Sequence, residues 1–250
     1  MGGAPGAERR SASAAKLGAS SRTSARELTS CARWWSRRGE TARVRLALEA
    51  AGLRVVEAAA PARLDGGDVL FTGREFFVGL SRRSNAAGCE ALGRAFPGLR
   101  VTAVPLARLL PRQQVSKKGR ASGVGVGAAR ADAALHLKSV CSLLGPDTLA
   151  VADSELGRAL AFFLQDSSGV PRAARLAGRR LAFVLVPDEG AANVLFVNGA
   201  VLHQPRARFP RSLEALDDFA RAAGVSLVEV DTSELAKADG ALTCCSVLLP

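Results

Sequence analysis

The chain has 250 residues, of which 48% are hydrophobic, enough to bury the core of one large domain or two small ones. It contains no run of about 18 apolar residues, which argues against a membrane-spanning helix. The cysteines are odd in number (five), and none are spaced as CxxC. This usage favours free thiols in a reducing compartment such as the cytoplasm and makes a structural zinc site unexpected.

The formal net charge of +11 is concentrated in two segments. Residues 1–45 carry a net charge of +7 and residues 107–131 one of +6, so the rest of the chain is close to neutral. Apart from Trp34 and Trp35, neither segment has the interleaved aromatic side chains that stack on bases. The charge distribution therefore argues against a nucleic-acid-binding protein.

Two low-complexity segments flank or interrupt the expected domain, which spans residues 36–250. Residues 1–35 are rich in Ala, Ser, Gly and Arg and predict a disordered tail. Their shortage of acidic residues resembles a transit peptide, so a mitochondrial location is the alternative to a cytoplasmic one. Residues 107–134 predict a flexible insertion, because their glycine-rich run lacks the lysine–serine pair of a phosphate-binding loop.

Helices and strands alternate from residue 40 onward. An amphipathic helix is predicted over Thr41–Ala51, ending at Gly52, and a valine-rich strand over Leu53–Glu57. The same order recurs in helices over Asn85–Phe96, Ser154–Gln165 and Ser212–Ala223. These helices precede predicted strands over Leu99–Pro105, Arg180–Val186 and Val225–Val230. The recurrence predicts an α/β fold built from a repeated unit.

Three polar residues follow the strands of this repeat at matching places. They are Asp65 in LDGGDVL, His136 in LHLKS and Cys244 in LTCC. In a repeat arranged around an axis, equivalent positions meet at the centre. An ordinary α/β domain whose strand ends happen to be polar explains the same pattern, so both interpretations stay open at this point. The other histidine, His203, lies at a predicted strand end and is interpreted as a bystander.

The three residues permit nucleophilic catalysis. A cysteine nucleophile needs a base to form thiolate near neutral pH, and His136 could serve Cys244 in this way. The carboxylate of Asp65 could then hold the imidazole in one tautomer and favour its charged form. Cys245 and Cys141 remain alternative thiols, since most cysteines are small apolar residues of the core.

Four segments carry a family resemblance. Residues 64–81 read LDGGDVLFTGREFFVGLS, and the others read LHLKSVCS (135–142), VPDEGAAN (186–193) and SELAKADGALTCCSVL (233–248). Together they resemble the dimethylarginine dimethylaminohydrolases, which belong to the guanidino-modifying or pentein superfamily with arginine deiminases and amidinotransferases. The likeness extends from about Ser36 to Leu248 and implies a five-bladed α/β propeller of ββαβ modules, with the site at its axis.

The resemblance also implies an activity. It is the hydrolysis of asymmetric dimethylarginine and monomethylarginine to citrulline and methylamines, which relieves inhibition of nitric oxide synthesis. By motif, Cys244 is the nucleophile that forms a covalent thiouronium-type intermediate, His136 is the general acid and base, and Asp65 orients His136. The implied partner is a small methylated arginine, with no cofactor, nucleic acid or membrane. Zinc captured by the Cys244 thiolate would inhibit.

Further positions are carried over for substrate binding. Arg83 in SRRSN and Arg37 in SRR match arginines that bind the amino-acid end of the substrate, since a guanidinium fork binds both carboxylate oxygens. Asp239 lies on the loop where the family contacts substrate. Family members also carry, before the Ser36 match, a blade with an acidic cluster for the guanidinium. The expectation is therefore an incomplete propeller, with a non-catalytic binding protein as the alternative function.

Overall fold

The computed structural model describes residues 40–109, 136–168, 180–238 and 240–248. The predicted tail over residues 1–35 and most of the predicted insertion over 107–134 lie outside these ranges, as do Arg37 and Asp239. Within the described residues, no helix is long and apolar enough to cross a membrane.

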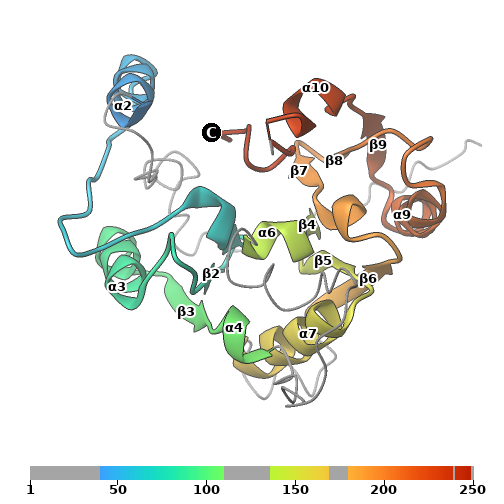
Figure 1. Ribbon diagram of the computed structural model, residues 1–250, viewed down its shortest axis with the longest axis horizontal. Coiled ribbons are helices and arrows are strands. Elements are labelled where there is room, and N and C mark those ends of the chain that lie inside the picture. Colours follow the sequence, from blue (N-terminus) through green and yellow to red (C-terminus); the bar gives the residue numbers. More distant parts are fainter. Residues whose placement is uncertain (1–39, 110–135, 169–179, 239, 249–250) are drawn as a thin grey trace, which may run out of the picture.

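Three copies of one ββαβ module make up most of the described chain (Figure 1). The first consists of β1 (Val69–Phe71), β2 (Glu75–Gly79), α3 (Ala86–Ala95) and β3 (Arg100–Val104). The second consists of β4 (Cys141–Gly145), β5 (Thr148–Ala152), α7 (Glu155–Ser167) and β6 (Ala182–Val186). The third consists of β7 (Leu195–Val197), β8 (Ala200–His203), α9 (Pro210–Ala223) and β9 (Ser226–Glu229).

Each module forms its own three-stranded sheet with the same topology. The first two strands pair antiparallel, and the third pairs parallel to the second. A parallel neighbour requires a crossover connection, which the helix between the second and third strands supplies. The repeat that the sequence predicts is therefore present as three equivalent units.

Local signals set the ends of the predicted helices. The side chain of Asn85 accepts a hydrogen bond from the Gly88 N–H at 2.9 Å and caps the start of α3. Ser154 caps α7 in the same way through the Gly157 N–H at 3.1 Å. Gly224 ends α9 with a left-handed φ of 68°. The predicted bounds of these helices agree with the observed ones to within two residues.

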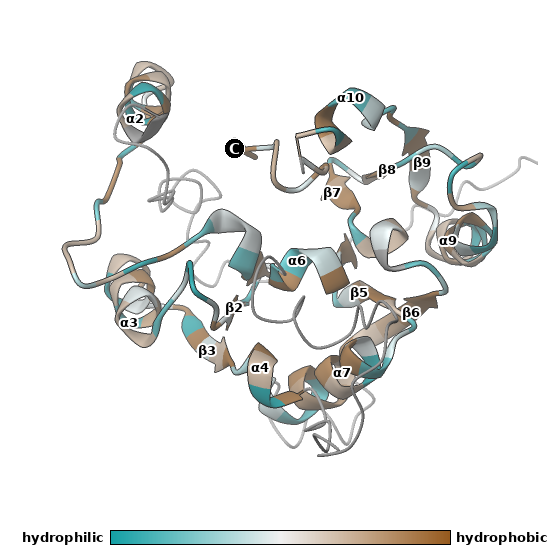
Figure 2. Ribbon diagram, in the orientation of Figure 1, coloured by the Kyte–Doolittle hydropathy of each residue, from teal (hydrophilic) through white to brown (hydrophobic). Residues whose placement is uncertain are grey.

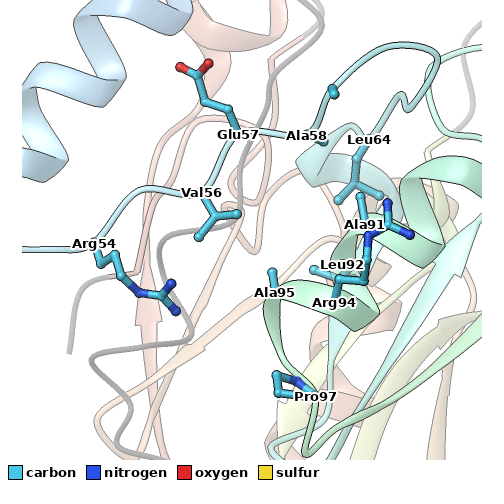
Figure 3. Close-up of a pocket in the computed structure, with 11 residues that line it drawn as sticks. Arg54, Val56, Glu57, Ala58, Leu64, Ala91, Leu92, Arg94, Ala95 and Pro97 are labelled. Carbon is cyan, nitrogen blue, oxygen red and sulfur yellow. The ribbon is translucent and has the colours of Figure 1, made fainter.

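The strand predicted over Leu53–Glu57 is wrong. Helix α2 (Glu40–Ala50) forms as expected, but the segment after it pairs with no strand of the three sheets in the described residues. A strand needs a neighbouring backbone for its hydrogen bonds, and a high valine content does not supply one. The segment instead forms one wall of a cavity of about 520 Å³ against α3, where Val56 faces Leu92 and Ala95 (Figure 3).

Short helices gather the starts of the three modules at the centre. The helices η1 (Gly66–Asp68), α6 (Leu137–Val140) and η2 (Glu189–Ala192) each precede the first strand of a module. Helix α6 packs against both η1 and η2, and β4 packs against both β1 and β7. Figure 1 shows α6 in the middle of the molecule, with α3, α7 and α9 around the outside. Two further short helices are α4 (Leu106–Leu109) and α10 (Ser233–Ala236).

A continuous hydrophobic core joins the three modules. It includes Phe77 from the first module, Leu144 and Leu149 from the second, and Val201 and Leu216 from the third. A smaller cluster around Leu64, Phe76 and Leu92 belongs to the first module alone. In Figure 2 the strand β7 is brown, whereas the surface helix α10 includes teal residues. Strands β2, β4 and β5 are the most buried, whereas the module starts carry polar side chains such as Asp65 and His136.

Candidate active site

Asp65 caps the short helix η1 immediately before the first module. Its Oδ1 accepts a hydrogen bond from the Gly67 N–H at 2.8 Å, and it lies 3.4 Å from Nε2 of His136. The residue is 8% exposed. Burial alone raises the pKa of the carboxyl group, but the hydrogen bonds from His136 and Gly67 favour the charged form and bring the pKa below its ordinary value.

His136 precedes α6 at the start of the second module, and Gly67 of η1 lies directly against its ring. A Cβ atom added at Gly67 would lie 2.6 Å from Cγ of His136, far inside van der Waals contact. Hydrogen bonds to Asp65 and then to Cys244 raise the pKa of His136 to about 9, although burial opposes them. The imidazole is therefore protonated at neutral pH and faces two acidic groups.

Cys244 lies in the turn after α10 and is partly buried. Its hydrogen bond with His136 lowers the pKa of the thiol; burial opposes this effect, and the charges of His136 and Lys138 assist it. The sequence left Cys141 and Cys245 open as alternatives. Cys141 is fully buried on β4, and this burial raises its pKa, whereas Cys245 is exposed. The structure thus favours Cys244 as the thiolate of the site.

Arg83 also reaches this group of residues. It lies on the loop after β2, and its Nη1 is 3.2 Å from Nε2 of His136. The positive charges of His136 and Arg83 both stabilise the Asp65 carboxylate. The structure therefore brings four of the six predicted site residues together. The other two, Arg37 and Asp239, lie outside the described residues.

Asp68 is a residue of the site that the sequence interpretation missed. It is fully buried, and its Oδ2 accepts hydrogen bonds from the hydroxyl groups of Ser81 at 2.7 Å and Ser84 at 2.8 Å. Its Oδ1 accepts from the Leu137 N–H at 3.2 Å, next to His136. Burial raises the pKa of Asp68 despite these donors. The second Asp in LDGGD was the available signal, but its partners lie in other segments.

Ser84 connects Asp68 with Asp65, because its hydroxyl oxygen also accepts the Asp65 N–H at 2.9 Å. The loop that carries Arg83, the η1 helix and the start of α6 are therefore fixed by one hydrogen-bonded network. Lys138 of LHLKS belongs to the same region. Burial lowers its pKa, and the nearby charges of Cys244, Asp65 and Asp68 oppose this shift.

The remaining histidine, His203, lies apart from this group. His203 is buried at the end of β8, where its Nδ1 is 2.8 Å from the Gln204 carbonyl oxygen. In the ranges that the structure describes, no group of three or more His, Cys, Asp or Glu side chains could hold a metal ion. Inhibition by zinc at Cys244 stays a prediction. The arrangement of Cys244, His136 and Asp65 suits attack by a thiolate with proton transfer through the imidazole.

Comparisons with known proteins identify the class. The fold matches a solved cysteine-to-serine variant of dimethylarginine dimethylaminohydrolase from Pseudomonas aeruginosa in complex with citrulline. The TM-score is 0.53 and the identity 25%, over 82% of this chain and 64% of that one. The chain therefore has the α/β propeller fold of the guanidino-modifying superfamily, as the sequence predicts. No family model matches the chain.

Curated relatives narrow the class to one family. A Bos taurus protein named DDAH2, described provisionally as a hydrolase, is 34% identical over 225 residues, covering 86% of this chain and 66% of that protein. The N(G),N(G)-dimethylarginine dimethylaminohydrolase of Streptomyces coelicolor is 33% identical over 216 residues, covering 86% and 65%. The chain belongs to the dimethylarginine dimethylaminohydrolase family. It spans slightly less than two thirds of the length of these relatives.

Proposed function

We propose that this chain hydrolyses Nω-methylated arginines, namely asymmetric dimethylarginine and monomethylarginine, to citrulline and dimethylamine or methylamine. The observation that carries the proposal is the contact series from Asp65 through His136 to Cys244 at the centre of the three modules. Support comes from the family, in which the Streptomyces coelicolor relative is named for this reaction.

The reaction follows from the charges of the pair. The Cys244 thiolate attacks the guanidinium carbon, and the His136 imidazolium gives its proton to the departing methylamine. This leaves a thiouronium-type intermediate on the sulfur and a neutral imidazole. His136 then takes a proton from water as the hydroxide adds to the same carbon. The adduct collapses to citrulline as the thiolate leaves, and the hydroxyl proton passes to the released amine. Asp65 holds the ring and stabilises its charged form in both half-reactions.

Substrate binding is assigned to three further residues. Arg83 and Arg37 bind the α-carboxylate of the amino acid, because an arginine fork donates to both of its oxygens. Asp239 contacts the substrate from the loop before Cys244. The reaction needs no cofactor, and the small methylated arginine is the partner. In a cytoplasmic location the activity removes methylated arginines and so relieves inhibition of nitric oxide synthesis.

The test is citrulline formation from asymmetric dimethylarginine by the purified full chain. We expect turnover by the unaltered chain, loss of turnover in Cys244→Ser, and retention in the matched variant Cys245→Ser, since the neighbouring thiol is exposed and outside the contact series. Peptide mass spectrometry of an acid-quenched reaction should find the covalent adduct on Cys244. Equal citrulline from the unaltered chain and from Cys244→Ser would reject the proposal.

A binding protein that keeps the fold without turnover is the second candidate. Both carboxylates beside the His136–Cys244 pair are already engaged, Asp65 by His136 and Asp68 by the loop after β2 and the start of α6. A buried guanidinium needs a carboxylate of its own, for which Asp239 remains as a candidate. Calorimetric titration separates the two functions: saturable binding of asymmetric dimethylarginine without citrulline formation favours the second.

A further inference from the structure

A single buried amide joins the loop of the nucleophile to the helix of the base. The side chain of Asn193 accepts a hydrogen bond from the Thr243 N–H at 3.0 Å and donates to the Thr243 hydroxyl group at 2.8 Å. Its Nδ2 also donates to the Lys138 carbonyl oxygen at 3.0 Å. Thr243 immediately precedes Cys244, and Lys138 lies two residues after His136. The amide therefore fixes both partners of the proton-transfer pair from one point.

Asn193 is itself held rigidly on both sides. It follows η2 and is 4% exposed. The hydroxyl group of Ser142, on β4, donates to the carbonyl oxygen of Ala192 and accepts the Val194 N–H at 3.0 Å. The residues before and after Asn193 are thus fastened to the central module. Such support keeps a positioning side chain in one rotamer.

The place of Asn193 in the fold matches that of the proposed catalytic residues Asp65 and His136. Asp65 lies at the start of η1 before the first module and His136 at the start of α6 before the second. Asn193 lies between η2 and β7, at the start of the third module. Because α6 packs against η2 as well as η1, the third module also brings a polar side chain to the centre.

We propose that Asn193 is a positioning residue for the reaction, which holds the Cys244 turn against the start of α6 so that the thiolate meets the His136 imidazolium. The inference rests on the proposed function for its role in turnover. An asparagine suits the place because the position requires one acceptor, for the Thr243 N–H, and two donors. An aspartate would direct an acceptor at the Lys138 carbonyl oxygen, which would then lose its hydrogen-bond donor.

The experiment measures the reactivity of Cys244 without substrate, so it does not depend on turnover. The full chain carrying Cys245→Ser is alkylated with iodoacetamide from acidic to alkaline pH, and labelling of the Cys244 peptide is followed by mass spectrometry. In the Asn193→Ala variant, we expect the midpoint to rise by about one pH unit and labelling at neutral pH to fall roughly tenfold, because only thiolate reacts. Asn193→Asp should shift the midpoint in the same direction.

Matched variants separate positioning from stability. Ser212 is equally buried and exchanges two hydrogen bonds with Asp188 at the opposite end of η2. We expect Ser212→Ala to lower the melting temperature comparably while leaving the labelling midpoint unchanged. Thr243→Val, which loses one of the hydrogen bonds of the amide, should raise the midpoint by less than Asn193→Ala, and Thr243→Ser should restore it.

An unchanged Cys244 midpoint in folded Asn193→Ala overturns the inference. If that variant does not fold, Thr243→Val decides in its place, because it keeps the size of the side chain and removes a single contact. An unchanged labelling midpoint in Thr243→Val would then overturn the inference in the same way. Failure of the unaltered chain to make citrulline, with the expected shifts in labelling, would reject the proposed function and leave the role of Asn193 in positioning the thiolate intact.

Discussion

At the scale of single residues, the site depends on a competition of charges around His136. The Asp65 carboxylate and the Cys244 thiolate favour the imidazolium. The Arg83 guanidinium lies 3.2 Å from Nε2, the ring nitrogen that also faces Asp65, and a like charge at that distance disfavours the imidazolium. The outcome is a pKa of about 9 for His136 and a lowered pKa for Cys244, so the two shifts reinforce each other. A base with a raised pKa remains protonated when the nucleophile attacks, which is the state that the departing amine needs.

Replacing Asp65 by asparagine should reverse this balance. Because the hydrogen bond to Asp65 is the largest cause of the shift, we expect the pKa of His136 in Asp65→Asn to fall from about 9 toward 6.5, and the pKa of Cys244 to rise. The chain has two histidines, so proton NMR can follow the ring signal of His136 as the pH is changed. In His203→Gln only one ring signal remains, and it belongs to His136. A pKa of His136 that is the same with and without Asp65→Asn contradicts the prediction.

The same pair makes stability depend on pH in a defined window. The pKa of His136 is raised in the folded state, so the stability that this residue contributes is fully present below pH 6.5. It is lost as the pH rises through about 9. The pKa of Asp65 is lowered in the folded state, so the stability that this residue contributes is present above pH 3.8. It is lost as the pH falls through the pKa of the folded state. In urea unfolding, the free energy of unfolding of the unaltered chain should therefore exceed that of Asp65→Asn by the largest amount at mildly acidic pH. An advantage that grows from neutral to alkaline pH contradicts this assignment.

Individual site residues differ in how far the sequence predicts them. The repeat places Asp65, His136 and Cys244 at matching positions, and a reacting thiol, imidazole and carboxylate are recognisable by type. Asp68 accepts a hydrogen bond from Leu137, which is 69 residues away in the sequence. Asn193 accepts one from Thr243, which is 50 residues away. The residue type of an aspartate or an asparagine does not reveal such partners, so these two roles can be recognised only from the fold.

At the scale of elements, the packing of η1 against the His136 ring permits no side chain at Gly67. An added Cβ would lie 2.6 Å from Cγ and 2.7 Å from Nδ1 of the ring, so Gly67→Ala must displace the imidazole or the helix. Displacements of about 1 Å can reduce turnover on the order of a hundredfold, and we expect a loss of that size in citrulline formation. In contrast, Gly98→Ala, in a turn with nothing within 4 Å, should retain full turnover. Equal rates for the two variants would contradict a steric requirement at η1.

The elements that the sequence predicts well are those whose signals are local. Asn85 and Ser154 cap their helices through amides three residues away, and Gly224 ends α9 through its own φ. The segment 53–57 has the valines of a strand, yet strand formation depends on a partner elsewhere in the chain. The first two strands of each module also escaped prediction with bounds. Strands β1 and β7 have only three residues each, too few to show the alternation of apolar and polar residues that marks a strand.

At the scale of the molecule, the three modules share one core, and the site lies where they meet. The buried side chains of β4 and β5 contact apolar residues from the modules on either side, so the second module connects the other two. The contacts between η1, α6 and η2 at the module starts therefore require that the shared core is folded. The geometry of the Asp65, His136 and Cys244 series is thus a property of the assembled modules rather than of one unit.

A cavity in the second module should therefore loosen the whole molecule. Leu144 lies on β4 with no exposed surface, and Leu144→Ala should lower the free energy of unfolding by about 2–5 kcal/mol. We expect one cooperative urea transition, with faster hydrogen exchange in both the β1–β2 and β7–β8 hairpins. The matched variant Leu46→Ala, on α2 where the residue is 62% exposed, should change stability little. Faster exchange limited to β4 and β5 would show that the modules unfold independently and that the site does not depend on a shared core.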